Sequence, residues 1–174
     1  MSLLVDPPFA LGQTLGVSST SDGTGCVGAV KEFTDIDPTT GVIRSNRRKV
    51  CVACRNTSGY ALLPKKLVAV SAIGDAGACN TVAGNEYVGV VDEFLPTAGV
   101  AANDVFWVII EGPTEVLADA AVLADNAIAS DAAATSGAAT AGRVVATTTN
   151  SIGRAVSAAA TAGDAFLAIV KSKA

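Results

Sequence analysis

Histidine is absent from this sequence, and aromatic residues make up only 5% of its 174 positions. Histidine is the commonest general base, the commonest metal ligand and the usual partner of a serine or cysteine nucleophile. A scarcity of aromatic side chains also disfavours a deep ligand pocket with large apolar walls. We therefore expect a non-enzymatic protein, with no catalytic residues, no cofactor, no metal and no small-molecule substrate.

Long hydrophobic runs are missing as well. The mean hydropathy is positive, but the longest strongly apolar stretch, residues 105–110, is far shorter than the roughly 18 residues that span a bilayer. The N-terminus has no basic flank and reaches Asp6-Pro7-Pro8 too early for a secretory signal. We expect no membrane contact and synthesis in the host cytoplasm.

A strand pattern occurs twice in the second half of the chain. Residues 88–91 and 104–109 form the first copy, and residues 152–155 and 164–169 form the second. In each copy a short apolar stretch containing glycine precedes an Asp-led run of branched and aromatic residues. This pattern is typical of paired strands joined across a turn, and its recurrence indicates a partly duplicated β-scaffold.

The connection between the two segments differs in length between the copies. It covers 15 positions from Gly89 to Asp104 but only 11 from Gly153 to Asp164. The longer connection contains the apolar pair Phe94-Leu95. We expect this departure from the repeat to lie at a rim and to contact another subunit.

Short apolar segments separated by turn residues predict the remaining strands. Pro113 is expected to end the strand that begins at Val105, and the segment from Leu117 leaves a short helix open as an alternative to loop and strand. The predicted strands are residues 30–33 and 41–43, paired as a hairpin, and residues 49–55, 67–70, 87–91, 105–110, 127–130, 143–147, 153–156 and 165–170.

These segments together predict an all-β fold, a small β-barrel or β-sandwich with an extended N-terminal arm. The predicted division places an arm and β-hairpin at residues 1–48 and a compact β-domain at residues 49–174. The Ser- and Gly-rich stretch at residues 18–25 is expected to order only against a partner, or to remain a plain disordered tail.

Charge is distributed unevenly along the chain. Residues 31–66 contain eight basic and three acidic residues, a net charge of +5, whereas residues 67–142 contain ten acidic residues and no Lys or Arg. This asymmetry suits association with copies of the same chain or with an oppositely charged lattice, although two solvated surfaces would look the same. Arg44, Arg47 and Arg48 are the best candidates for docking onto an acidic protein surface. A sequence pI near 4.7 argues against nucleic-acid binding.

Cysteine and carboxylate side chains are the candidate metal-binding, redox and catalytic groups of the chain. Cys51 and Cys54 have the spacing of a zinc knuckle or a redox motif, but Cys26 and Cys79 stand alone. In a strand, positions 51 and 54 point to opposite faces, which favours buried small hydrophobes over a disulfide or a metal site.

Carboxylates near the strand ends could cleave a glycosidic bond, but no feature fixes their separation. Those carboxylates are Asp92, Glu93, Asp104 and Glu111.

The chain resembles the tailed-phage capsid decoration (cement) proteins over roughly residues 51–174. The resemblance rests on residues 55–59, 61–64, 88–93, 103–108, 111–114, 152–155 and 162–167. It implies a compact β-domain, commonly a homotrimer, that lies on the outer surface of an icosahedral head and bridges subunits of the major capsid protein. The alternative is another virion structural module, such as a head-fibre base or a tail-associated β-protein. The expected partner-binding residues are Arg44, Arg47, Arg48, Phe94 and Leu95. The N-terminal arm could dock on the capsid or exchange between protomers.

Overall fold

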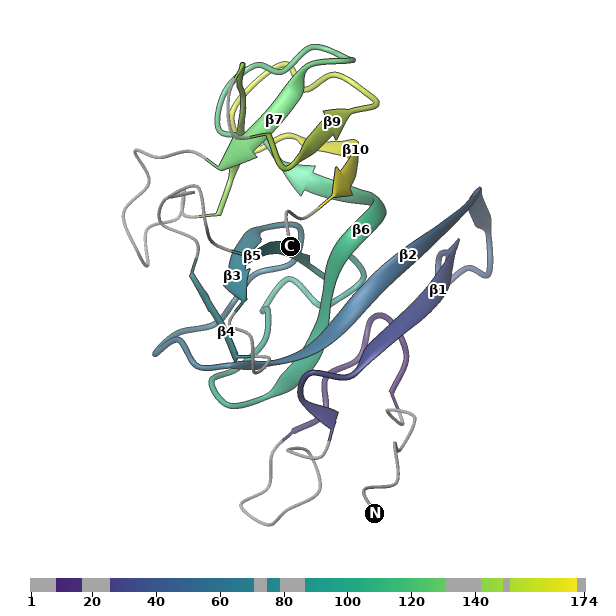
Figure 1. Ribbon diagram of the computed structural model, residues 1–174, viewed down its shortest axis with the longest axis vertical. Coiled ribbons are helices and arrows are strands. Elements are labelled where there is room, and N and C mark those ends of the chain that lie inside the picture. The colour runs from purple at the N-terminus through teal and green to yellow at the C-terminus, as the bar shows by residue number, and fades with distance from the viewer. Residues whose placement is uncertain are drawn as a thin grey trace.

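The computed structural model describes residues 9–16, 26–70, 75–78, 87–130, 142–148 and 151–171, among which there is no α-helix (Figure 1). Its strands form one hydrogen-bonded sheet in the order β1-β2-β4-β3-β5-β6-β10-β9-β7-β8. The all-β prediction is confirmed. The strands are β1 (Val30–Ile36), β2 (Ile43–Asn56), β3 (Leu67–Val70), β4 (Asp75–Ala78), β5 (Tyr87–Val91), β6 (Val105–Leu117), β7 (Ala127–Ser130), β8 (Val144–Ala146), β9 (Gly153–Ala155) and β10 (Ala165–Lys171).

The first half of the sheet closes on itself. β2 pairs with β4 and also with β6, so β2, β4, β3, β5 and β6 make a closed circuit of pairings, which we call the first module. The sheet as a whole is not one barrel, because β1 and β8 end it without pairing to each other. Alternate residues of the circuit form one apolar cluster, which includes Val52, Cys54, Val68, Val70, Ala76, Val91, Phe106 and Val108.

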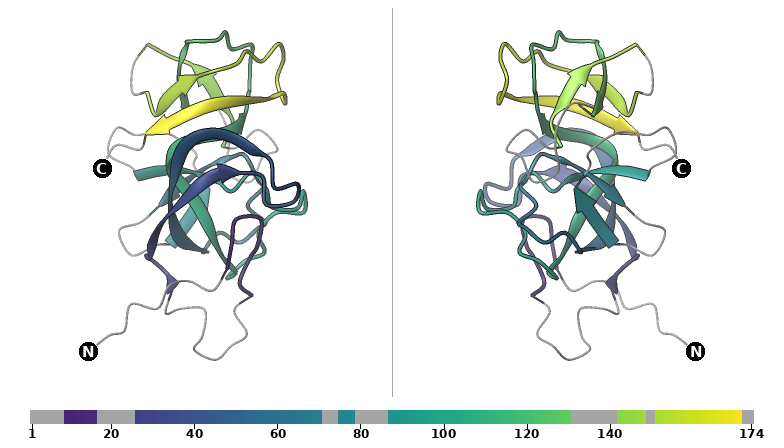
Figure 2. Two further views of the ribbon diagram at one scale, coloured as in Figure 1. Left: turned by 90° about the vertical axis from the view of Figure 1, so that its right-hand side faces the viewer. Right: turned by 90° about the vertical axis from the view of Figure 1, so that its left-hand side faces the viewer.

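The second half repeats this arrangement. β6 pairs with β10, β9 and β7 follow, and β8 is joined back to the end of β6 by a bridge between Ala118 and Val144. That bridge is parallel, as is the pairing of Asn56 with Ala76 that closes the first module. We call β6–β10 the second module. Figures 1 and 2 show it stacked above the first, with the long strand β6 running through both.

Equivalent strand pairings show that the predicted duplication is structural. Val90 pairs with Ile109 between β5 and β6, and Arg154 pairs with Ile169 between β9 and β10. These residues occupy matching positions in the two copies of the sequence pattern. The pairing of β3 with β5 is likewise repeated by β7 with β9. The duplication is therefore more extensive than the two segments that revealed it.

Strand β6 extends past the point where the sequence predicts its end. Pro113 lies inside β6 and pairs with Ile169 of β10, so the prediction that it ends the strand is wrong. β6 changes partners here, because its pairing with β2 stops at Glu111 and its pairing with β10 takes over. Gly112 has φ +114°, and a Cβ at this position would overlap the Arg48 carbonyl. A proline is tolerated at such an irregular point in a strand.

Other strand boundaries also differ from the predictions. Ile43 and the predicted segment 49–55 belong to one strand, β2, which continues through the basic residues between them instead of breaking into a loop. β4 was not predicted, since Asp, Ala and Gly are poor strand formers. Residues 127–130 are a strand as predicted, and no helix begins at Leu117. The division of the chain at position 48 falls within β2 and stays a prediction.

The described part of the N-terminal arm, residues 9–16, packs against the first module. Phe9 stacks on Trp107 with ring centroids 4.7 Å apart, and the Trp107 indole N–H donates to the Phe9 carbonyl at 3.1 Å. Leu15 makes an antiparallel bridge to Val105. These residues lie in, or pack against, an apolar cluster that continues into the second module. The stretch at residues 18–25 lies outside the described residues.

Candidate interaction surface: a braced β-hairpin

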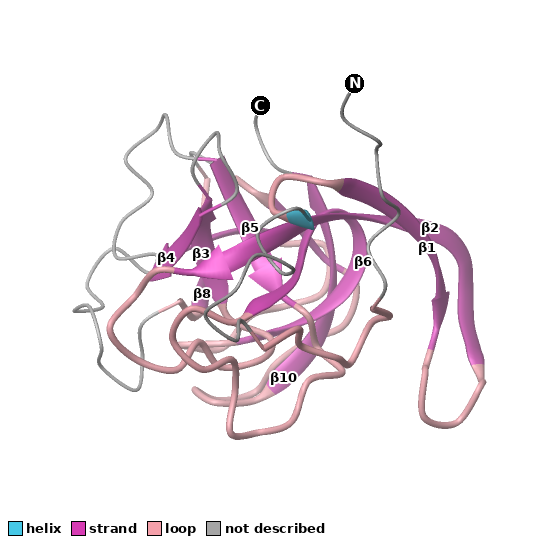
Figure 3. Cartoon of the chain, turned by 90° about the horizontal axis from the view of Figure 1, so that it is seen from below, coloured by secondary structure: helices cyan, strands magenta, loops and turns pink. Residues whose placement is uncertain are grey.

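Strands β1 and β2 form a hairpin that projects from the body of the molecule (Figures 1 and 3). Their pairing extends from Val30–Val52 at the base to Ile36–Ile43 near the tip. The turn is fixed by the Asp37 carboxylate, which accepts the Thr39 N–H at 2.8 Å. That hydrogen bond lowers the pKa of Asp37, so the turn keeps its ionised cap well into acidic solution.

A buried ion-pair network holds the hairpin to the first module. Lys49 of β2 has a fully buried side chain, and its ammonium group lies 3.0 Å from a carboxylate oxygen of Asp35 on β1. The same ammonium group donates to Glu93, whose side chain is also buried. Ser45 donates its hydroxyl to the second Asp35 oxygen at 2.8 Å. Lys49 therefore ties both hairpin strands to the loop that carries Glu93.

Arg44 forms the second half of this network. Its guanidinium group donates to both oxygens of Glu93, at 2.9 and 3.0 Å, in the paired geometry that favours arginine over lysine. Both cations also lie over the Phe94 ring, with Arg44 5.1 Å and Lys49 4.7 Å from its centroid. The loop therefore supplies a carboxylate and an aromatic face to the two hairpin cations.

Glu93 also joins the hairpin to β6, because Glu93 accepts the backbone N–H of Glu115 at 3.0 Å. It lies in the connection that is longer in the first copy of the repeat than in the second. The longer connection of the first module therefore braces the hairpin, and the shorter connection of the second module carries no carboxylate at the corresponding position. The prediction that this loop makes a subunit contact remains untested.

Asp92 holds the N-terminal arm beside the same loop. Its carboxylate is buried and accepts the N–H groups of Gly12, at 2.5 Å, and of Phe94, at 3.1 Å. Burial raises the pKa of Asp92 to about 6, although both hydrogen bonds and the nearby Lys49 ammonium group oppose the shift. Two adjacent carboxylates, Asp92 and Glu93, thus fix the arm and the hairpin respectively.

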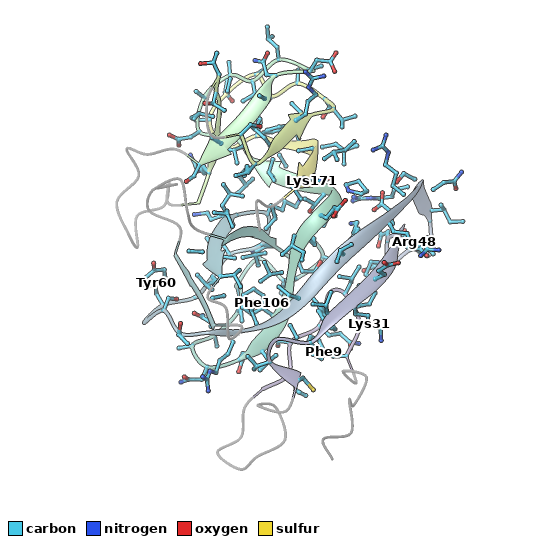
Figure 4. All side chains as sticks on the ribbon, in the orientation of Figure 1. Phe9, Lys31, Arg48, Tyr60, Phe106 and Lys171 are labelled. Atoms are coloured by element: carbon cyan, nitrogen blue, oxygen red, sulfur yellow. The ribbon has the colours of Figure 1, made fainter. Side chains whose placement is uncertain are left out.

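We call the network of Asp35, Arg44, Lys49 and Glu93 the brace. Outside the brace, the end of the hairpin is exposed. Val42 and Ile43 are 59% and 62% exposed, although both are large apolar residues. Arg47 is exposed further along β2. Arg48, labelled in Figure 4, is exposed too and pairs with the exposed Glu32 of β1 at 2.7 Å.

The five residues predicted to bind a partner fall into three environments. Arg44 and Phe94 come together inside the brace, and Arg44 is largely covered. Leu95 is buried in the interior cluster of the first module. Arg47 and Arg48 are exposed on the hairpin. Their roles in partner binding stay a prediction, and only the last two have side chains at the open surface.

The inner residues of the brace were not identified from the sequence. Lys49 ends a basic run that looks like a solvated surface, yet its side chain is fully buried. A signal was available, because Lys49 shares a strand face with Cys51 and Ala53, which are both buried apolar residues. Its partner Glu93 is 44 positions away along the chain, and no local pattern connects the two.

The cysteines within the described residues have reduced, buried side chains. Cys51 and Cys54 belong to different apolar clusters, which confirms that they point to opposite faces of β2. Burial raises the pKa of the Cys51 thiol. Within the same described ranges, no group of three or more Cys, Asp or Glu side chains is placed to hold a metal ion. No helix in this part of the chain is long and apolar enough to cross a membrane.

Known proteins similar to this chain are found by structure and not by sequence. No family model matches the chain, and no curated protein matches it either. The chain is similar to the solved structure of the head fiber gp8.5 N base of bacteriophage phi29, with 14% sequence identity. The match covers 71% of this chain and 98% of the phi29 chain, with a TM-score of 0.42.

Proposed function

We propose that this chain is a structural protein of a tailed-phage virion that binds the outer surface of the head and stabilises contacts between major capsid protein subunits. The observation that carries the proposal is the projecting β1–β2 hairpin, whose base is locked by buried ion pairs while its end is exposed. The resemblance of residues 51–174 to the capsid decoration proteins supports the same role.

The architecture suits attachment to a repeating surface. Two small modules share strand β6 and one continuous apolar cluster, which makes a stiff body. A rigid hairpin on such a body loses little conformational entropy when it binds, so a modest contact area can give useful affinity. The proposed role needs no catalysis, and we propose that the chain is not an enzyme.

The proposal is tested by mixing the purified chain with expanded heads that lack it. Saturable binding is expected, together with greater resistance of the decorated heads to heat or to a chelator. Sedimentation of the heads followed by quantification of the bound chain measures the first property. Loss of internal DNA on heating measures the second. Absence of binding would refute the proposal.

The second candidate is the base of a head fibre or a tail-associated module, and the name of the phi29 protein describes such a fibre base. The copy number in purified particles distinguishes the two roles. A number that matches the number of capsomers supports decoration, and a few copies per particle support a fibre or tail role. We further propose that the chain forms a homotrimer, which sedimentation equilibrium of the purified protein tests directly.

A further inference from the structure

We propose that the hairpin tip docks the protein by inserting Val42 and Ile43 into an apolar recess of the capsid shell that carries carboxylates at its rim, where Arg47 binds. The tip is defined here as residues 36–43, and Arg47 lies further along β2. This inference rests on the proposed function and deepens it, because it identifies the docking element and the chemistry of the surface that receives it.

Exposed apolar side chains at the tip are the first observation. Val42 and Ile43 are adjacent, whereas the other large exposed apolar residues of the described chain are separated from one another in sequence. Those others are Val30, Leu123 and Val156. Single exposed apolar residues are normal on soluble proteins, but an adjacent pair at the end of a projecting hairpin indicates a contact site (Figure 3). Branched side chains of this size fit a small recess.

Charge supplies the second observation. The Arg47 side chain is exposed and makes no hydrogen bond or ion pair with any residue in the described ranges, while the Arg48 guanidinium group is already paired with Glu32. Within the tip, the Asp37 carboxylate accepts two backbone N–H groups of the turn and stays ionised. Arg47 therefore presents an unpaired positive charge on β2, and this charge is complementary to carboxylates on a protein surface.

The brace explains why the tip is held ready to bind. Arg44 and Lys49 anchor β2 to Glu93 at positions that flank Arg47 in the sequence. A hairpin fixed in this way presents its tip in one orientation, so binding does not have to order it. Placing the anchoring cations inside also leaves the exterior of the hairpin free for a partner.

The experiment compares the affinities of four full-length variants for expanded, undecorated heads. V42S and the double variant V42S/I43S remove the apolar tip, R47E reverses the free charge, and V30S is the matched control at the base of the same hairpin, where Val30 is 63% exposed. Near-UV circular dichroism and the urea midpoint verify that each variant is folded. V42S keeps the test valid if the loss of Ile43 disturbs its pairing with Ile36.

We expect V42S/I43S to bind on the order of tenfold more weakly, as for the loss of central interface residues, and V42S to show a smaller loss. R47E should bind more weakly and with a flatter dependence on salt, and V30S should bind like the unaltered chain. If the unaltered chain binds heads and the tip variants bind equally well, the docking inference is wrong while the proposed function stands. Sensitivity to R47E alone would indicate a purely electrostatic contact, such as one with nucleic acid, and would also overturn it. If the unaltered chain does not bind heads, both proposals fail.

Discussion

Replacing Lys49 with methionine should destabilise the protein more than any change of a surface charge. Methionine keeps much of the apolar stem of lysine but removes the ammonium group that lies between Asp35 and Glu93. The side chains of these two acids are 2% and 1% exposed, so K49M leaves two buried carboxylates with Arg44 as their remaining strong cation. Removing one partner of a buried ion pair costs about 3–5 kcal/mol, because the remaining charge stays desolvated.

Urea unfolding followed by Trp107 fluorescence measures this loss. With a typical slope of about 2 kcal/mol per molar urea, the expected cost lowers the midpoint by roughly 2 M. The matched control is R48M, which removes an ion pair of similar length on the same strand, where the side chains of Arg48 and Glu32 are 76% and 55% exposed. An exposed pair contributes about 1 kcal/mol at most, so R48M should scarcely shift the midpoint.

The double variant K49M/E93Q sharpens the test. The second substitution removes the charge of one of the two buried carboxylates that K49M leaves without an ammonium partner, so part of the stability lost in K49M should be recovered. The double-mutant cycle gives the coupling energy between Lys49 and Glu93. If K49M costs no more than R48M, the network is not a buried brace and the reasoning is refuted. A cost for K49M that is simply additive with the cost of E93Q would refute the direct pairing alone.

Three further outcomes are expected. The pKa of Asp92 is raised to about 6, so protonation of Asp92 stabilises the folded state. This stabilisation is fully present below pH 3.8 and is lost as the pH rises through 6. Relative to D92N, the unaltered protein should therefore gain about 1 kcal/mol of unfolding free energy between pH 7 and pH 5, and a flat difference would contradict the assignment. G89A should lower the free energy of unfolding by about 1–3 kcal/mol, because its Cβ would overlap Val108. The control G59A, with open space around the new Cβ, should lower it less than G89A does. Equal effects would count against the tight packing of the first module. In a C79S background, Cys26, Cys51 and Cys54 are buried and should react with a thiol reagent only as the protein unfolds, and rapid reaction of the native protein would disprove their burial.

The positions of most strands follow from local patterns in the chain. Period-two alternation and branched side chains identify the segments at 67–70, 87–91, 105–110 and 165–170, because these residues favour a pleated, partly buried backbone wherever it occurs. The repeated motif even fixes equivalent strand registers in the two modules, since the same alternation must bury the same faces. A segment such as β4, with weak local preference, forms a strand only because β2 and β3 supply hydrogen-bonding partners on both sides.

By itself the sequence determined the fold class, the duplication, the opposite directions of Cys51 and Cys54, and the loop where the repeat is broken. Tertiary structure decided what that loop does. The burial of Lys49 and the ion pair of Arg44 with Glu93 depend on contacts between residues more than 40 positions apart. Such contacts leave no periodic pattern in the sequence. Charge in a sequence looks the same whether it is solvated or paired, so only the folded arrangement separates the paired, largely covered Arg44 from the exposed Arg47.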